Sequence, residues 1–201
     1  QRQMCIRDRP MDALTLLKDR SSTLPRFLGE PAPSDAELAQ MFEAATRVPD
    51  HGMVRPWRFV VLRGEDRQAM GEVFVKALMS RNPDASEDAI NAERNRALRS
   101  PIVVAVLART KPHPKVPNVE QVVSAGQAAL AIHLAGQAMG YGSVMLTGDN
   151  AYDPTVKSFF GLGDEDSIVA YLYMGTPTAE VPGKSRPEVQ EFVEPFGAHA
   201  G

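Results

Sequence analysis

The run Pro101–Ala108, which reads P-I-V-V-A-V-L-A, constrains the fold more than any other part of the sequence. A strand that faced water on one side would alternate apolar and polar residues, whereas this run is almost continuously apolar. We therefore predict a strand that is covered on both faces by other parts of the chain. Further strands are expected over residues 59–62, within 140–148 and over 167–174.

Helical patterns surround these strands, and the clearest of them begins at Ser34. Ser34 and Glu37 have the spacing of a capping box, and apolar residues follow at helical spacing until Arg47. The stretch 87–98 is charged and holds few large apolar residues, which favours a surface lid or arm. Other helices are expected over residues 12–20, 65–80 and 118–140, with a short one after Asp153.

Composition excludes several classes of protein. A chain of 201 residues fits one domain with a sizeable core. Its net charge of -3 gives no general attraction to nucleic acid or to an anionic membrane, and no apolar run approaches the roughly 20 residues that span a bilayer. The single cysteine, Cys5, excludes an internal disulfide and a cysteine-rich metal site, which suits a cytoplasmic protein.

The first helical pattern opens at Met11-Asp12-Ala13-Leu14, and the ten residues before it carry three arginines without a long apolar core. They do not form a secretory signal. We expect a non-native or disordered extension over residues 1–10, one domain over 11–196 and a C-terminal tail over 197–201.

The loop between residues 48 and 59 holds the only tryptophan and a proline near each end. Prolines restrict the backbone and remove donors, so we expect a rigid polar loop. It would bring Asp50, His51, Arg55 and Trp57 to one place, where binding chemistry often lies. A plain helix-to-strand connection with a buried tryptophan is the alternative interpretation.

Arg20-Ser21-Ser22 is the best candidate for an anion site, because a guanidinium and hydroxyls can share phosphate oxygens. The same cluster is also typical of a plain helix end. Further cations stand at Arg47 and in the tail around Arg186, and a helix rich in small residues over 124–135 lies between them in sequence. This pattern suits a bulky, flat, phosphorylated ligand held across an interface, and it leaves the ligand's identity open.

Several familiar sites are absent from the sequence. Gly140 and Gly142 are followed by Met145 where a dinucleotide loop needs a small residue, and they come after a helix and before a strand, the wrong order for that fold. The four histidines are scattered, no hydrolase elbow is present, and no metal site is predicted.

The ordered set of motifs resembles the FMN-dependent nitroreductase family. Its marks are Met11-Asp12-Ala13-Leu14, Arg20-Ser21-Ser22, Pro49-Asp50-His51 and Pro56-Trp57-Arg58-Phe59, followed by the helix and turn over 124–142 and by Gly175-Thr176-Pro177. The likeness covers about residues 11–196. It implies an α+β, nitroreductase-like fold in which helices wrap a mixed β-sheet, in an intertwined homodimer with two FMN sites at the subunit interface.

The resemblance also implies site residues. The flavin and its phosphate would be bound by Arg20, Ser21, Ser22, Met145, Leu146, Thr147 and, in the tail, Arg186. The partner subunit would contribute Arg47, Pro49, Asp50 and His51. The nicotinamide nucleotide would lie near Ala135, Gly136, Gln137, Ala138, Met139 and Gly140.

The implied activity is that of an oxidoreductase that moves hydride from NADH or NADPH to FMN and then to a nitroaromatic, quinone-like or other small electron acceptor. No catalytic side chain is implied, because the flavin carries the chemistry. Dehalogenation, heterocycle oxidation, flavin breakdown and non-catalytic flavin binding remain alternatives. Larger relatives carry Asn and Gln before Pro-Trp, where this chain has Met53 and Arg55, so the contacts of that Asn are not transferred.

Overall fold

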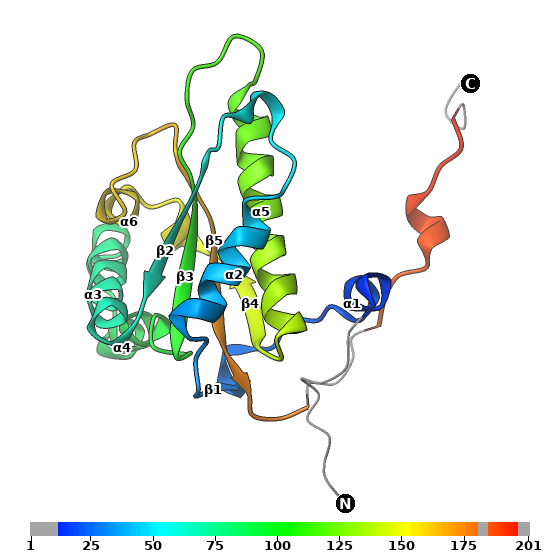
Figure 1. Ribbon diagram of the computed structural model, residues 1–201. Helices are drawn as coiled ribbons and strands as arrows, with labels where there is room; N and C mark the ends of the chain where they lie inside the picture. The colour runs from blue at the N-terminus through cyan, green and yellow to red at the C-terminus, as the bar shows by residue number, and fades with distance from the viewer. Residues whose placement is uncertain (1–11, 181–184, 197–201) are drawn as a thin grey trace, which may run out of the picture.

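The computed structural model describes residues 12–180 and 185–196, and it places one sheet between two layers of helices (Figure 1). β5 is the central strand, with β3 and then β2 on one side and with β4 and β1 on the other. The strands are β1 (Leu28–Gly29), β2 (Trp57–Leu62), β3 (Ile102–Ala108), β4 (Gly142–Leu146) and β5 (Ser167–Pro177).

The expected α+β architecture is confirmed, but each strand pair in the described residues is antiparallel, so the sheet is not mixed there. The connections explain this difference. Two helices separate β2 from β3 and return the chain to the sheet in the opposite direction. One helix separates β3 from β4, which run the same way, but β5 lies between them and is antiparallel to both.

Residues Ile102–Ala108 of β3 are all buried, as the apolar run predicts. The core has two parts. Phe74 and Tyr171 belong to the part on one face of the sheet, and Met41 and Leu172 belong to the part on the opposite face. Figure 1 shows α2 (Asp35–Ala45) and α5 (Asn118–Ala138) on the second side, with α3 (Gly64–Arg81), α4 (Glu87–Arg96) and α6 (Pro154–Phe159) on the first.

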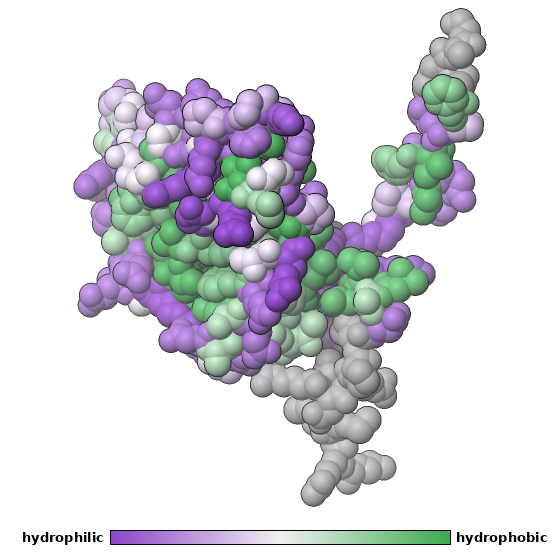
Figure 2. All heavy atoms as spheres, turned by 45° about the horizontal axis from the view of Figure 1, so that its top comes forward, coloured by the Kyte–Doolittle hydropathy of each residue, from purple (hydrophilic) through white to green (hydrophobic). Residues whose placement is uncertain are grey.

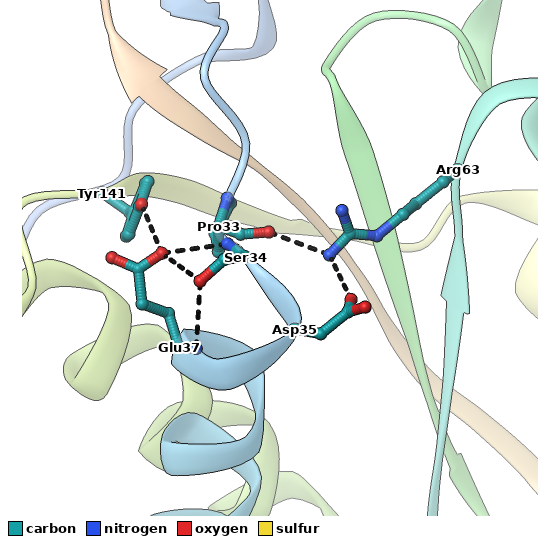
Figure 3. A network of polar contacts seen from close by, with 6 residues as sticks. All are labelled: Pro33, Ser34, Asp35, Glu37, Arg63 and Tyr141. Atoms are coloured by element: carbon teal, nitrogen blue, oxygen red, sulfur yellow. Dashed lines mark hydrogen bonds and ion pairs between the residues drawn. The ribbon is translucent and has the colours of Figure 1, made fainter.

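The start of α2 is fixed by a network of polar contacts around Ser34 and Glu37 (Figure 3). The predicted capping box is present, since Ser34 Oγ accepts a hydrogen bond from Glu37 N and the Glu37 carboxylate accepts one from Ser34 N. Tyr141 donates to the same carboxylate at 2.9 Å, and Arg63 donates to Pro33 O at 2.8 Å. The turn before β4 and the end of β2 are thereby tied to one helix terminus.

The stretch 87–98 is not a free lid or arm. Its helix α4 packs on α3 so closely that a Cβ on Gly71 would lie 2.5 Å from the Arg94 carbonyl oxygen. Glu93 is buried there, accepting a hydrogen bond from Asn150 and pairing with Arg96. These two contacts offset the free-energy cost of burying a charged carboxylate. The spacing of apolar residues in the sequence gives no sign of them.

Helix α1 (Ala13–Asp19) buries none of its residues, and the segment 185–196, which includes the short 3-10 helix Val189–Phe192, reaches away from the sheet (Figure 1). The predicted extension 1–10 and tail 197–201 lie outside the described residues. Among the residues that are described, no helix combines the length and apolarity needed to cross a membrane. The remaining 3-10 helices are Pro25–Phe27, His51–Met53 and Asp149–Ala151.

Candidate functional site

Arg20, Ser21 and Ser22 follow α1 directly and lie against the C-terminal half of α5. Asp12 caps α1 by accepting a hydrogen bond from Thr15 N, and the backbone becomes extended at Arg20. The Gln137 side chain then holds this segment twice, since its Oε1 accepts from Ser21 N at 3.3 Å and its Nε2 donates to Asp19 O at 3.3 Å.

Two further residues that are far away in sequence contact Arg20, one at its guanidinium and one at its backbone carbonyl. Arg20 Nη1 lies 3.4 Å from Nε2 of His133, whose Nδ1 lies 2.5 Å from Ser143 Oγ at the start of β4. Arg186 donates to Arg20 O at 2.5 Å. Burial, and secondly the charge of Arg20, lower the pKa of His133 to about 4, although a hydrogen bond with the Ser21 backbone opposes this shift.

This cluster has the chemistry of a phosphate site. It places the Arg20 guanidinium and two serine hydroxyls on one short segment, and the Arg186 guanidinium contacts the backbone of that segment. Within the described residues neither the Ser21 nor the Ser22 hydroxyl is engaged by another protein group. Arg20 is half-buried, which limits competition from water. Charge-assisted hydrogen bonds from such donors favour an anion with several oxygens.

Pro49, Asp50 and His51 lie at the other end of α5. Ser124 Oγ donates to Pro49 O at 2.9 Å, and His51 Nδ1 lies 2.6 Å from Glu120 Oε2. An open hollow of about 240 Å³ is lined by Pro49, His51, Glu120 and Ser124 together with Val119, Val123 and Gln127.

The loop does not gather its four polar and aromatic residues in one place. Trp57 is the first residue of β2 and turns into the core beside α2 and α5, because alternate residues of a strand face opposite sides. Asp50 is used within the loop, where its carboxylate accepts from Arg55 N at 2.8 Å. Met53 and Arg55 both have positive φ, so the Asp50–Arg55 hydrogen bond holds a backbone conformation that residues other than glycine rarely adopt. Arg55 itself is exposed.

Met145, Leu146 and Thr147 form the end of β4 and the turn after it. Met145 is 39% exposed, Leu146 is half-buried and Thr147 is exposed. β4 is tied to the segment that follows Arg20, because Thr23 N donates to Ser143 O at 3.0 Å. The predicted ring contacts therefore lie on the same strand that the Arg20 segment joins.

The comparison with known protein families decides the identity of this arrangement. The family described as "Nitroreductase family" matches residues 17–176 of the sequence. The chain belongs to the nitroreductase family. It is therefore an oxidoreductase.

Two curated proteins named "Putative NAD(P)H nitroreductase" are similar to this nitroreductase-family chain. YdjA of Escherichia coli (strain K12) is 38% identical over 167 residues, which are 83% of this chain and 89% of YdjA. A Haemophilus influenzae protein is 37% identical over 167 residues, with the same shares of the two chains.

Solved structures agree on the fold. A nitroreductase-like family protein from Bacillus cereus has a TM-score of 0.78 at 21% identity, covering 92% of this chain and 96% of its own. A variant of the FMN- and NADPH-dependent nitroreductase NfnB from Sphingopyxis sp. strain HMH has a TM-score of 0.69 at 21% identity. The match covers 93% of this chain and 100% of the NfnB chain.

Arg47 lies elsewhere in this nitroreductase-family chain. It pairs with Glu43 at 3.2 Å on the exposed side of α2 and lines an open hollow of about 440 Å³ with Ala135, Ala138 and Met139. Arg47 is thus next to the segment predicted for the nicotinamide nucleotide, and it does not line the hollow of Pro49 and His51.

The segment 135–140 is only partly accessible in this nitroreductase-family chain. Gly136 is buried, and a Cβ on it would lie 3.2 Å from the Met174 side chain. Gln137 holds the Arg20 segment, and Gly140 has the positive φ of a turn residue. Ala138 is the exposed member.

Sequence reasoning missed three supporting residues. His133 and Glu120 belong to none of the sequence motifs described above, and Gln137 is predicted there as a nucleotide contact and not as a support for the Arg20 segment. Their partners lie 113, 116 and 69 residues away, so no local spacing could reveal them. In the ranges 12–180 and 185–196, no group of three His, Cys, Asp or Glu residues could hold a metal ion.

Proposed function

We propose that this chain is an FMN-dependent oxidoreductase that takes hydride from NADH or NADPH and passes it to a small acceptor, such as a nitroaromatic compound or a quinone, in a ping-pong cycle. The observation that carries the proposal is the donor cluster of Arg20, Ser21, Ser22 and Arg186, which fits a phosphate. The names of the curated relatives and of the NfnB structure support the same donor and cofactor.

In this proposal, FMN supplies the redox chemistry when it is bound, and the chain binds, orients and electrostatically tunes it. The Arg20 guanidinium and the two serine hydroxyls hold the phosphate. Gln137 and His133 keep that segment in place from α5. Met145, Leu146 and Thr147 lie along the ring, and the hollow beside Ala138 accepts part of the nicotinamide nucleotide.

The exposed face of α5 supports a homodimer with shared sites. Val119, Val123 and Leu130 are 65%, 54% and 38% exposed, and helical spacing places them on one face together with Gln137. A surface stripe of this kind favours a helix of a second copy as its cover.

Two-fold symmetry then explains why the predicted contacts form two separate clusters. Ser124, which holds Pro49, and His133, which holds Arg20, lie nine residues apart on α5, or about 14 Å at 1.5 Å per residue. If the two α5 helices pair antiparallel about a two-fold axis, the first half of one helix meets the second half of the other. The Pro49–His51 segment of one copy then faces the Arg20–Ser22 segment of its partner.

The C-terminal segment supports an intertwined form of this dimer. Val189, Phe192, Val193 and Phe196 are all strongly exposed, and Figure 2 shows apolar side chains on the projecting segment and on α1 near it. If a second copy covers these projecting apolar side chains, the dimer is stabilised by about 25 cal/mol for each Å² of apolar surface that is buried.

The visible spectrum of the purified protein tests the proposal. We expect flavin absorption that NADH or NADPH bleaches without oxygen and that returns when a nitroaromatic or quinone acceptor is added. A colourless protein that takes up no FMN on titration would refute the cofactor. Bound flavin that neither nucleotide bleaches would remove the proposed electron donor.

A further inference from the structure

A separate hollow of about 240 Å³ opens at the end of β4, on the face of the sheet that α3 and α4 cover. Alternate residues of a strand face opposite sides, so Tyr171 and Tyr173 of β5 line this hollow, whereas Leu172 packs on the α5 side. The cluster of Arg20 and His133 also lies on the α5 side. The sheet therefore separates the hollow from the site that we propose for the flavin phosphate.

Two exposed arginines, Arg96 and Arg99, give the hollow a positive charge. Arg96 Nε lies 2.7 Å from the carboxylate of the buried Glu93, and a Cβ on Gly148 would lie 3.9 Å from Arg96 Nη1. Arg99 Nε donates to Arg96 O at 3.3 Å, and among the described residues no carboxylate pairs with Arg99. Glu93 thus neutralises only one of the two guanidinium groups.

Aromatic and apolar side chains form much of the remaining lining. The Arg99 guanidinium lies 5.3 Å from the centroid of the Tyr173 ring, which is close enough for a cation–π contact. Phe74, Leu146 and Tyr171 supply further apolar surface, and the Tyr171 hydroxyl is already used, because it donates to a backbone carbonyl. A ligand that fits this lining carries an anionic group for the guanidinium groups and a flat apolar part for the rings.

The size of the hollow limits the ligand. Sites that hold drug-sized molecules enclose about 300–1,000 Å³, so a hollow of about 240 Å³ suits a smaller molecule than a nucleotide or a flavin. A carboxylate matches the planar fork of a guanidinium with two parallel hydrogen bonds, and a ring attached to it covers apolar surface. Inorganic phosphate would satisfy the charge and leave the apolar surface uncovered.

We propose that this hollow is a second ligand site, which binds a small aromatic carboxylate through Arg96 and Arg99. The carboxylate lies between the two guanidinium groups, and its ring lies against Tyr171 and Leu146. Neither arginine belongs to a motif that the family resemblance uses. The site does not depend on FMN, because it lies across the sheet from the Arg20 cluster, so it stands or falls separately from the proposed function.

Isothermal titration calorimetry of the full chain with benzoate tests this site. We expect saturable binding of one benzoate per chain, with the same affinity whether or not FMN is present. Benzamide has nearly the same shape without the charge, and it should bind about tenfold or more weakly, since it forms no charge-assisted hydrogen bonds. Inorganic phosphate should also bind more weakly than benzoate, because it makes no use of the apolar lining.

Arg99→Gln is the most direct variant, because its loss of charge leaves Glu93 paired with Arg96. The affinity for benzoate should fall about tenfold or more in this variant, and further in Arg96→Gln/Arg99→Gln. As a control, Arg94→Gln removes a guanidinium of α4 that pairs with Glu72 and does not line the hollow, so the affinity should stay unchanged. The comparison of benzoate with benzamide needs no variant, and it tests the charge even if a variant folds poorly.

Backbone amide chemical shifts of the isotopically labelled protein locate the ligand. Benzoate should shift the amide signals of Thr147 and Gly148, which line the hollow, and these shifts should saturate with the affinity found by calorimetry. Shifts centred on Arg20, Ser21 and Ser22, or competition between benzoate and FMN, would place the carboxylate in the proposed flavin site and overturn the inference.

The other outcomes are equally decisive. Absence of saturable benzoate binding, or an unchanged affinity in Arg99→Gln, would overturn the site. Phosphate that binds as tightly as benzoate would overturn the aromatic assignment and make the hollow a general anion site. A protein that binds benzoate in this hollow and takes up no FMN would refute only the proposed function, whereas uptake of FMN without benzoate binding would refute only this inference.

Discussion

Nη1 of Arg20 lies 3.4 Å from Nε2 of His133, although 113 residues separate them in sequence. A guanidinium can only donate, so Nε2 accepts and the ring proton resides on Nδ1, which donates to Ser143 Oγ. The buried imidazole is therefore neutral, in agreement with its pKa of about 4. A helix-borne histidine thus fixes the direction of the arginine that we propose for the phosphate.

His133 predicts a pH dependence of stability. Its pKa is about 4 when folded and 6.5 in an unfolded chain, so between these values the unfolded state binds more protons and stability falls as pH falls. The free energy of unfolding should decrease by about 3 kcal/mol between pH 7 and pH 4 through this residue. Urea unfolding of wild type and His133→Asn measures it, and the variant should lack this part of the decrease.

The exposed His113 provides the matched control for this experiment. His113→Asn should show the wild-type pH dependence. Equal pH dependence in wild type and in His133→Asn would show that His133 is not a buried neutral group.

Arg20→Ala tests the phosphate site directly. Loss of a charge-assisted hydrogen bond should weaken FMN binding by about 1.5–3 kcal/mol, which raises the Kd roughly ten- to hundredfold. Binding of riboflavin should change little, because it lacks the phosphate. Arg26→Ala removes an exposed guanidinium that stacks on Phe27, and it should leave both affinities unchanged. An unchanged FMN Kd in Arg20→Ala would refute the assignment.

Much of the fold could be predicted from local pattern. The uninterrupted apolar run of β3 indicated a strand covered on both faces, and Ser34 with Glu37 indicated the start of α2. These signals depend on residues a few positions apart. The strands β2 and β5 extend beyond the predicted ends, since their outer residues pair with neighbouring strands that only the folded chain supplies.

The supporting contacts of the site could not be predicted in this way. The local sequence predicts an exposed side chain at Glu93. The side chain is buried, because Arg96 and the distant Asn150 form an ion pair and a hydrogen bond with its carboxylate. Gln137 lies in a segment expected to bind a nucleotide, yet its amide is used by Asp19 and Ser21. Such pairings depend on the arrangement of whole elements, which sequence spacing does not encode.

Asp153 and Asp35 form a matched pair for a stability prediction. Asp153 is 6% exposed, caps α6 at Thr155 N and pairs with Arg81, whereas the Asp35 side chain is 97% exposed where it pairs with Arg63. Asp153→Ala should lower the free energy of unfolding by about 3 kcal/mol, since it removes a helix cap and a buried ion-pair partner.

Asp35→Ala should lower the free energy of unfolding by less than about 1 kcal/mol, because exposed pairs contribute little. Urea unfolding at pH 7 compares the two variants. Although burial, the largest single influence, opposes ionisation of Asp153, hydrogen bonds from Thr155 and Arg81 lower its pKa, so its stabilising contribution should be lost as the solution is acidified below the ordinary carboxyl range. Equal losses in the two variants would contradict the role of burial.

A mixed dimer tests whether each flavin site uses two chains. Arg20→Ala and His51→Ala are placed on separately tagged copies, and the mixed dimer is purified through both tags. If each site combines Arg20 of one copy with His51 of the other, one site carries both substitutions and the other carries neither. We then expect one tight FMN per mixed dimer, measured by absorbance and fluorescence titration, while both parent dimers bind weakly. If both residues of a site came from the same chain, every site of the mixed dimer would carry one defect, and no tight site would appear.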